Sequence, residues 1–350
     1  MCAAELRIPS FNAHRFQTGT QREREREATI LIENEGQFGI SGLTDDNQII
    51  DPALMEETYR AIDIFFRKLP EEVRLGCVHP VDANLGYSWP GREEYGTGSD
   101  KDVWKQLLRF NIVRGYPRRL WPSDQKLKRH LKFEDELAMA RFQNSGIYQI
   151  HAQLVNLGTI ALNALAEFYY GLGPNYFSGT RNVGGKDYRL VQENTLQLIQ
   201  YLNGTEPELQ EYFEGRKAKV GDLIFGEHAD SSAGTIGDMR KDPEHCLEGK
   251  VGNEWRPVVV EGGTYFFQFG KNYRLLIEAL IAEGKIDPDK LKYGTLAETL
   301  HRGVRRSVES QRPGIVDFLH PQADMPLLNG MVTGDVLKRD LGEYMAKAPQ

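Results

Sequence analysis

Cysteine is scarce in this 350-residue sequence, and long apolar runs are absent from it. The three cysteines, Cys2, Cys77 and Cys246, are too few and too widely separated for a disulfide framework or a cysteine-based zinc cluster. No segment approaches the roughly 18 consecutive apolar residues that a membrane-spanning helix needs, and the first residues lack the apolar centre of a signal peptide. These absences predict a soluble protein of the reducing cytoplasm, with no membrane partner.

The sequence also lacks an excess of positive charge. Its formal net charge is −7 and its isoelectric point lies near 5.7, which argues against nucleic acid as a partner. The run QREREREA at residues 21–28 alternates in sign, which indicates a solvated face. With 40% hydrophobic and 27% charged residues, the composition predicts a globular protein that is long enough for a sizeable core.

The first half of the sequence is dominated by helical periodicity. Residues 52–69 predict a helix, because apolar side chains recur there at spacings of three and four. Residues 133–170 predict a second, longer helical stretch by the same criterion. Residues 28–43 are predicted instead to form a strand, a glycine-containing turn and a second strand.

Short apolar runs of strand length dominate the second half. They are rich in β-branched and aromatic residues, and turn residues separate TLQLIQYL, DLIFGEHA, RPVVVEGGTYFFQFG and RPGIVDFL. Such a series predicts a mostly β core, closed or built from two sheets, with supporting helices. We expect one domain with an N-terminal arm (1–27), a region packed on the core (28–130), a helix and the β core (131–325) and a C-terminal helical tail (326–350).

The segment GDLIFGEHADSSAGTIGDM, residues 221–239, places His228 and Asp230 at alternate positions where a strand ends. Residues i and i+2 of a strand point to the same side, so both side chains can converge on a divalent metal. His301 stands just before a later apolar strand and adds a second imidazole. This set leaves three octahedral positions open and suits non-haem Fe(II) that activates oxygen, although zinc hydrolases also use two histidines and a carboxylate.

Most of the other histidines carry weaker signals. His14 and His79 fall in predicted loops, whereas His130 and His151 fall in helical sequence. A surface histidine or a hydrogen-bonded core histidine is the usual situation at such positions. His245 precedes a cysteine, but neighbours in a strand point in opposite directions, which argues against a shared metal.

An arginine follows the third candidate ligand at a distance of eleven residues (312 − 301). Arg312 begins the predicted strand RPGIVDFL, so its permanently charged fork can face the far end of the same pocket. Such a fork can bind one carboxylate of a dicarboxylate co-substrate in bidentate geometry. A surface arginine is the alternative, as expected for Arg302, Arg305 and Arg306 nearby.

Several segments follow one another in the order found in a known family. They are GQFGISGLTDDNQIIDPALMEETYRAIDIFFRKLPEEVRLG, LGYSWPGREEYGTGSDKDVWKQLLRF, LQLIQYL, EHAD, GGTYFFQFGKNYRLL and TLHRGVRRS. Over roughly residues 28–321 the sequence resembles the isopenicillin-N-synthase-like branch of the iron- and 2-oxoglutarate-dependent oxygenases.

This resemblance implies a distorted double-stranded β-helix, or jelly roll, with a helical N-terminal support region. His228, Asp230 and His301 would be the catalytic iron ligands. Arg312 would pair with the distal carboxylate of 2-oxoglutarate, and Tyr201 would hydrogen-bond the same carboxylate. With Fe(II), 2-oxoglutarate and O2, the protein would act as a dioxygenase on an unactivated C–H bond of a small molecule. Hydroxylation, desaturation or cyclisation would result, and specialised metabolism is the expected setting.

Three features depart from the family's pattern. Gly314 stands two residues after the arginine, where a serine or threonine is usual, and Ile199 replaces an asparagine-like residue two positions before Tyr201. The distance of 73 residues between the two histidines (301 − 228) is also long. The extra length falls in residues 277–298, which we expect to form a helical lid that excludes water from the site.

Two other functions remain open at this point. An oxidase like isopenicillin N synthase would take all its electrons from the substrate and would use Arg312 to hold a substrate carboxylate. A non-catalytic jelly-roll binding protein would keep the sheet without the chemistry, although the complete set of candidate ligands argues against it.

Overall fold

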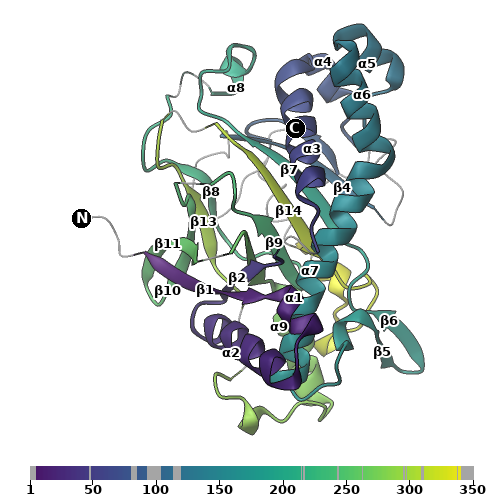
Figure 1. Ribbon diagram of the computed structural model, residues 1–350, viewed down its shortest axis with the longest axis vertical. Helices are drawn as coiled ribbons and strands as arrows, with labels where there is room; N and C mark the ends of the chain where they lie inside the picture. The colour runs from purple at the N-terminus through teal and green to yellow at the C-terminus, as the bar shows by residue number, and fades with distance from the viewer. Residues whose placement is uncertain are drawn as a thin grey trace.

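The computed structural model describes residues 5–339, apart from 47–48, 80–84, 93–103, 113–119, 214, 216, 243, 262, 295, 297, 309–310 and 337. Its largest element is a mixed β-sheet with helices packed on its outer side (Figure 1). The strands of this sheet are β1 (Leu6–Asn12), β2 (Ile40–Thr44), β3 (Gly86–Ser88), β4 (Lys105–Asn111), β7 (Thr195–Tyr201), β8 (Leu223–His228), β9 (Gly234–Asp238), β10 (Leu247–Val251), β11 (Glu254–Glu261), β12 (Tyr265–Phe269), β13 (His301–Val304) and β14 (Pro313–Leu319). A separate hairpin is made of β5 (Thr180–Val183) and β6 (Lys186–Arg189).

The strands of the large sheet follow the spatial order β3-β4-β7-β14-β9-β12-β2-β1-β11-β10-β13-β8. Neighbours are antiparallel except at β1, which runs parallel to β2 on one side and to β11 on the other. β1 therefore joins two antiparallel halves, and residues from both halves line a single cavity. Among the described strands no pairing joins β8 to β3, so the sheet curves around the cavity without closing. The predicted β core with supporting helices is confirmed.

The helices are α1 (Ala13–Thr18), α2 (Gln21–Phe38), α3 (Pro52–Asp63), α4 (Glu71–Leu75), α5 (Asp124–His130), α6 (Phe133–Arg141), α7 (Ile147–Phe168), α8 (Gln210–Phe213) and α9 (Lys271–Ala282). The long helix α7 packs against β9 and β14, and α3 packs against both α7 and α6 (Figure 1). α7 buries an apolar face toward the sheet that includes Ile150, Leu154 and Leu157. This layer supports the strands that carry one wall of the cavity.

Both predicted helical stretches are confirmed, each with a π-helical turn. Asp51 caps α3 by accepting a hydrogen bond from the Ala53 N–H at 2.8 Å, and Pro52 occupies the first turn. A π-helical turn at Ile64–Lys68 extends this helix to the residues before Pro70. In the second stretch a π-helical turn at Phe142–Gly146 links α6 to α7.

The prediction of two strands in residues 28–43 is wrong for its first part. The chain continues as α2 up to Phe38, turns at Gly39 with φ of +69°, and only then forms β2. Ala28 and Leu31 are fully buried at helical spacing, and the Asn34 side chain donates to the Pro9 carbonyl at 2.6 Å. Tertiary contacts of a helical face have therefore overridden the β propensity of the ILIE segment.

The structure also alters the predicted terminal segments. Residues 6–12 of the predicted arm form β1 inside the sheet, and the expected boundary at residue 28 falls within α2. In the predicted helical tail, residues 326–332 hold a short 3₁₀ turn at Leu328–Gly330, and helix occurs only within 333–339. Residues 340–350 of that tail lie outside the described part of the chain. None of the described helices is both long enough and apolar enough to cross a bilayer.

The lid predicted in residues 277–298 is wrong as well. Its first part belongs to α9, whose Ile277 and Leu280 are fully buried. Further along, the Tyr169 hydroxyl donates to the Gly294 carbonyl at 2.8 Å. No described residue of this segment lines the cavity. In the residues that the structure describes, the extra length is therefore used in packing the core and does not line the site.

Candidate metal centre

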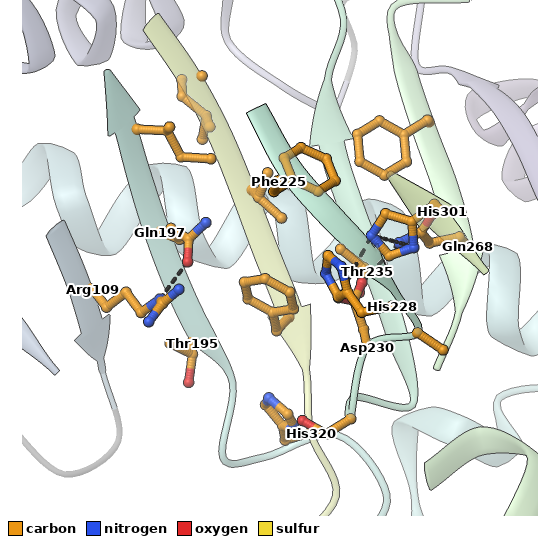
Figure 2. Close-up of a pocket in the computed structure, with 18 of the residues that line it drawn as sticks. Arg109, Thr195, Gln197, Phe225, His228, Asp230, Thr235, Gln268, His301 and His320 are labelled. Atoms are coloured by element: carbon orange, nitrogen blue, oxygen red, sulfur yellow. Dashed lines mark hydrogen bonds and ion pairs between the residues drawn. The ribbon is translucent and has the colours of Figure 1, made fainter. Parts of the chain in front are cut away.

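Two strands of the sheet bring the candidate ligands together. His228 ends β8, and His301 begins β13 directly opposite it in the antiparallel register. The two imidazole rings lie 4.4 Å apart between centroids. Asp230 follows β8 by two residues, and one ligand atom from each of the three side chains lies within 4.8 Å of the others. Figure 2 shows the three side chains turned toward one another at the edge of the cavity.

The distances among the three groups match a shared ion. Oδ1 of Asp230 lies 3.5 Å from Nε2 of His228 and 3.8 Å from Nε2 of His301. Asp230 and His301 are only 7% and 5% exposed. Within the described ranges, no other group of three His, Cys, Asp or Glu side chains lies close enough to hold a metal. Two imidazole nitrogens and one carboxylate oxygen thus form a facial set of donors.

Hydrogen bonds from outside the set fix which atoms of His228 and Asp230 face the centre, whereas the Gln268 amide nitrogen lies 3.2 Å from both ring nitrogens of His301. Nδ1 of His228 lies 2.8 Å from the Gly226 carbonyl oxygen and donates there, while Nε2 faces Oδ1 of Asp230 at 3.5 Å. Oδ2 of Asp230 accepts from the Thr235 hydroxyl at 2.6 Å and from the Gln268 amide at 2.8 Å, so Oδ1 remains available. This pattern of support is typical of metal ligands.

The protonation states of the buried ligands also suit a cation. Burial lowers the pKa of His301 to about 4, and the nearby Asp230 carboxylate only partly opposes that effect. For Asp230, burial raises the pKa, but His301, His228 and the Thr235 hydroxyl outweigh burial and hold it below its ordinary value. At neutral pH the site therefore presents a neutral imidazole at His301 and a charged carboxylate.

The cavity beside these ligands has a volume of about 560 Å³ and is lined by both halves of the sheet. Across it from the ligands, the Arg109 side chain on β4 donates to the Gln197 side chain on β7 (Figure 2). The strands β4, β7 and β14 thus provide one wall, and β8 and β13 provide the other.

The structure places the two predicted co-substrate residues next to each other in this cavity. Tyr201 ends β7, and its backbone N–H donates to the Arg312 carbonyl at 2.9 Å, just before β14. The Arg312 guanidinium carbon lies 4.5 Å from the centroid of the Tyr201 ring. Burial raises the pKa of Tyr201 to about 12, so its hydroxyl keeps its proton. Nε of Arg312 is buried without a hydrogen-bond partner.

The glycine at position 314 has a steric cause. A Cβ atom at Gly314 would lie 2.9 Å from Cε2 of Tyr201 and 3.5 Å from Cβ of Ile199. A serine would therefore push into the tyrosine ring. The two departures from the family pattern at 314 and 199 thus meet in one place, where β7 and β14 pair directly.

Sequence reasoning missed several polar residues of the cavity, among them Asp242 and His320. Asp242, on the loop after β9, forms an ion pair with Arg312, and its Oδ2 lies 3.1 Å from an Arg312 Nη atom. No local sequence pattern marks this contact, because 70 residues separate the partners (312 − 242). His320 lines the cavity just beyond β14, and burial lowers its pKa to about 4. Strand alternation could have found it, because Val316, Phe318 and His320 share the cavity face.

No family model matches the sequence, and no curated protein sequence matches it. Solved structures do resemble the chain. A full-length protein of Neurospora crassa, solved in complex with alpha-KG and thymine, is 20% identical, with a TM-score of 0.66 over 96% of this chain and 97% of that one. AtDAO1 of Arabidopsis thaliana, a dioxygenase for auxin oxidation solved with 2-oxoglutarate, is 16% identical, with a TM-score of 0.57 over 91% and 94%.

JOX2, solved with 2OG, Fe and JA, is 16% identical, with a TM-score of 0.59 over 93% of this chain and 78% of that one. The chain therefore has the fold of the 2-oxoglutarate- and Fe(II)-dependent oxygenases, as the sequence resemblance implied. At these identities the likeness concerns the fold, and chemistry has to be argued from the site.

Proposed function

We propose that the protein is an Fe(II)- and 2-oxoglutarate-dependent dioxygenase that oxidises an unactivated C–H bond of a small molecule. One observation carries the proposal. Nε2 of His228, Nε2 of His301 and Oδ1 of Asp230 converge at the edge of a large cavity, while other atoms of His228 and Asp230 are engaged elsewhere. The three solved structures named above contain alpha-KG or 2-oxoglutarate, and one also contains Fe.

The donor set fits ferrous iron. Two neutral imidazoles and one carboxylate bind from one side, so the other coordination positions face the cavity. Zinc can accept similar donors, but the large open space beside the ligands favours a metal that binds further molecules. Bound Fe(II) would supply the activation of O2 and the oxidising power for the C–H bond. His228, Asp230 and His301 would hold it in place.

The Arg312 end of the cavity fits the distal carboxylate of a 2-oxo acid. Arg312 is charged at all relevant pH values, and its unpaired Nε is a buried donor that lacks an acceptor. Tyr201 lies against the guanidinium and keeps its hydroxyl proton. Arg312 would anchor 2-oxoglutarate, and Tyr201 would donate a second hydrogen bond.

The wall of the cavity formed by β4, β7 and β14, across from the candidate metal ligands, would position the substrate. The cavity volume of about 560 Å³ suits a small organic molecule, and the Neurospora crassa protein and JOX2 were solved with thymine and JA in addition to the 2-oxo acid. The buried Arg109 and Gln197 side chains provide polar contacts there, while Phe318 and Val316 provide apolar ones. The orientation of the substrate would decide between hydroxylation, desaturation and cyclisation, and specialised metabolism is the proposed setting.

A second function is favoured by the Arg312–Asp242 ion pair. Arg312 already has a carboxylate partner and Gly314 offers no hydroxyl, so two contacts to 2-oxoglutarate are weakened or missing. An oxidase like isopenicillin N synthase needs no 2-oxoglutarate. In that case the electrons would come from the substrate alone.

Anaerobic titration with Fe(II), with and without 2-oxoglutarate, tests these functions. The leading proposal predicts one iron per chain and a visible charge-transfer band that appears only with 2-oxoglutarate and weakens in Arg312→Gln. Iron binding with no such band would support the oxidase. Binding of no metal would overturn both. His130→Ala, on the end of α5 and away from the cavity, serves as the control variant.

A further inference from the structure

The Arg312 end of the cavity contains a second, fixed carboxylate. The Asp242 side chain is 2% exposed and the Arg312 side chain 15% exposed, and Asp242 Oδ2 lies 3.1 Å from an Arg312 Nη atom. Both residues line the cavity. A dicarboxylate bound at Arg312 would therefore meet a negative charge that belongs to the protein.

The backbone around Asp242 holds this carboxylate in place. The Cys246 N–H lies 3.2 Å from Oδ1 and 3.0 Å from Oδ2 of Asp242, and the Asp242 N–H donates to the Met239 carbonyl at 3.0 Å. The Cys246 contacts tie the side chain to its own loop, so a rotamer that moved the carboxylate away from Arg312 would also break them. The ion pair is therefore part of the cavity wall in this structure.

The charges of this pair cancel before any co-substrate binds. One guanidinium normally neutralises one carboxylate, but here Asp242 already supplies that carboxylate. A distal carboxylate from 2-oxoglutarate would give the Arg312–Asp242 pair a net negative charge in a buried position, which is less favourable than binding to a guanidinium without a carboxylate partner. A neutral distal group that only accepts a hydrogen bond would still satisfy the unpaired Arg312 Nε without that charge.

We propose that Asp242 sets the co-substrate specificity of this site. Asp242 weakens the preference of the site for a 2-oxo acid with a distal carboxylate over a 2-oxo acid whose distal group is neutral and accepts hydrogen bonds. The inference rests on the proposed function, since it assumes that a 2-oxo acid binds with its distal end at Arg312. Selectivity between 2-oxo acids would then come from the Arg312–Asp242 ion pair, and the metal ligands would not provide it.

The test compares two probes, 2-oxoglutarate and its 5-methyl ester, on the Fe(II)-loaded protein without oxygen. The dissociation constant of each probe is read from the visible band of the iron–2-oxo acid complex, so no turnover is needed. In Asp242→Asn we expect 2-oxoglutarate to bind about tenfold more tightly, because a like charge a few ångströms away has gone. The ester should change little. The size of the ester methyl group affects binding to the wild type and to the variant alike. A change in the ratio of the two dissociation constants between the two proteins therefore reports charge.

Two further variants keep the experiment decisive. Asp242→Ser also removes the charge and keeps an acceptor for the Cys246 N–H, so it should shift the ratio in the same direction. Glu283→Gln is the matched control, because Glu283 pairs with the buried Arg181 and neither residue lines the cavity. That variant should leave both constants unchanged.

Each outcome separates this inference from the proposed function. If both probes give bands and the ratio stays the same in the two Asp242 variants, the specificity role is overturned while the oxygenase proposal stands. Weaker binding of 2-oxoglutarate in Asp242→Asn would also overturn it, because Asp242 would then only orient Arg312. Iron binding without a band for either probe in any variant would overturn the 2-oxo acid proposal and this inference together. A band for 2-oxoglutarate that appears only in the Asp242 variants would support the inference strongly.

Discussion

Two buried groups of histidine and aspartate in the described part of the chain can be compared, and one of them has the three converging donors that could hold a metal. His151 on α7 and Asp317 on β14 lie 2.7 Å apart between Nδ1 and Oδ2, sealed between helix and sheet. His228, Asp230 and His301 lie on the cavity side of the sheet. β14 separates the two environments, because Asp317 points toward α7 while Val316 and Phe318 line the cavity.

The comparison shows that residue type does not define a metal site. The sealed pair has one imidazole and one carboxylate joined by a single hydrogen bond through Oδ2, and Asp317 is fully buried. Burial raises the pKa of Asp317, although His151 opposes the change. The open group has three donors, hydrogen bonds that fix their orientation, and free space on one side. A third converging donor and access to a cavity are therefore the features that matter.

The largest expected effect is on the open group. Replacing His228 or Asp230 by alanine should abolish iron binding and reduce turnover by more than about a hundredfold, since the remaining two donors cannot hold the ion. Iron content per chain and oxygen consumption measure this. His151→Ala should retain full iron content. A His228→Ala protein that kept near-normal iron and activity would refute the assignment.

The next effect concerns the sealed pair. His151→Leu should reduce the free energy of unfolding by about 3–5 kcal/mol, because it leaves Asp317 buried without its partner. Urea unfolding of the metal-free protein measures this loss. His151→Leu with Asp317→Leu should recover much of the stability, since neither charge nor polar group remains. Equal stability of the single variant and the wild type would show that the pair does not contribute.

A smaller effect is expected on the cavity face of β14. Gly314→Ser restores the residue usual in the resembling family, yet we expect it to destabilise the protein by about 1–3 kcal/mol through overpacking against Tyr201. Tyr201→Ala combined with Gly314→Ser should remove that penalty. Thermal unfolding of these two variants, of Tyr201→Ala alone and of the wild type checks the expectation. A Gly314→Ser protein as stable as the wild type would mean that the ring moves aside freely.

The smallest effect is the pH dependence at His320. Burial lowers the pKa of His320 to about 4 from an ordinary value of 6.5, so below pH 6.5 the unfolded chain takes up a proton that the folded protein does not. Stability should therefore fall between pH 6.5 and 4. In His320→Gln the decrease should be smaller by about 1 kcal/mol per pH unit. Unfolding of metal-free protein at pH 7 and pH 5 measures this, with His130→Gln as control.

Local patterns explain what the sequence could predict. The alternation of His228 and Asp230 at a strand end is a short-range signal, and the capped helix that begins at Pro52 is another. In the structure the side chains of His228 and Asp230 converge with that of His301, as the alternation predicted. The assignment of the three as iron ligands stays a prediction that the experiments above address.

Long-range contacts explain what the sequence could not predict. The Arg312–Asp242 pair joins the residue just before β14 to a distant loop, and no local pattern in either segment predicts this contact. The error at residues 28–38 has a similar origin, because the buried face of α2 depends on partners elsewhere in the fold. The segment 277–298 was predicted to cover the site from its extra length and the need to exclude water, and its buried side chains show instead that it packs in the core.

The position of β1 carries a practical consequence for handling the protein. This strand is the only described element that pairs with both β2 and β11, so the two halves of the sheet meet through seven residues near the start of the chain. Trimming those residues would expose an edge of β2 and an edge of β11 at once, and exposed edges recruit other chains into aggregates. Expression tags are therefore best joined through a linker that leaves Leu6 to Asn12 untouched.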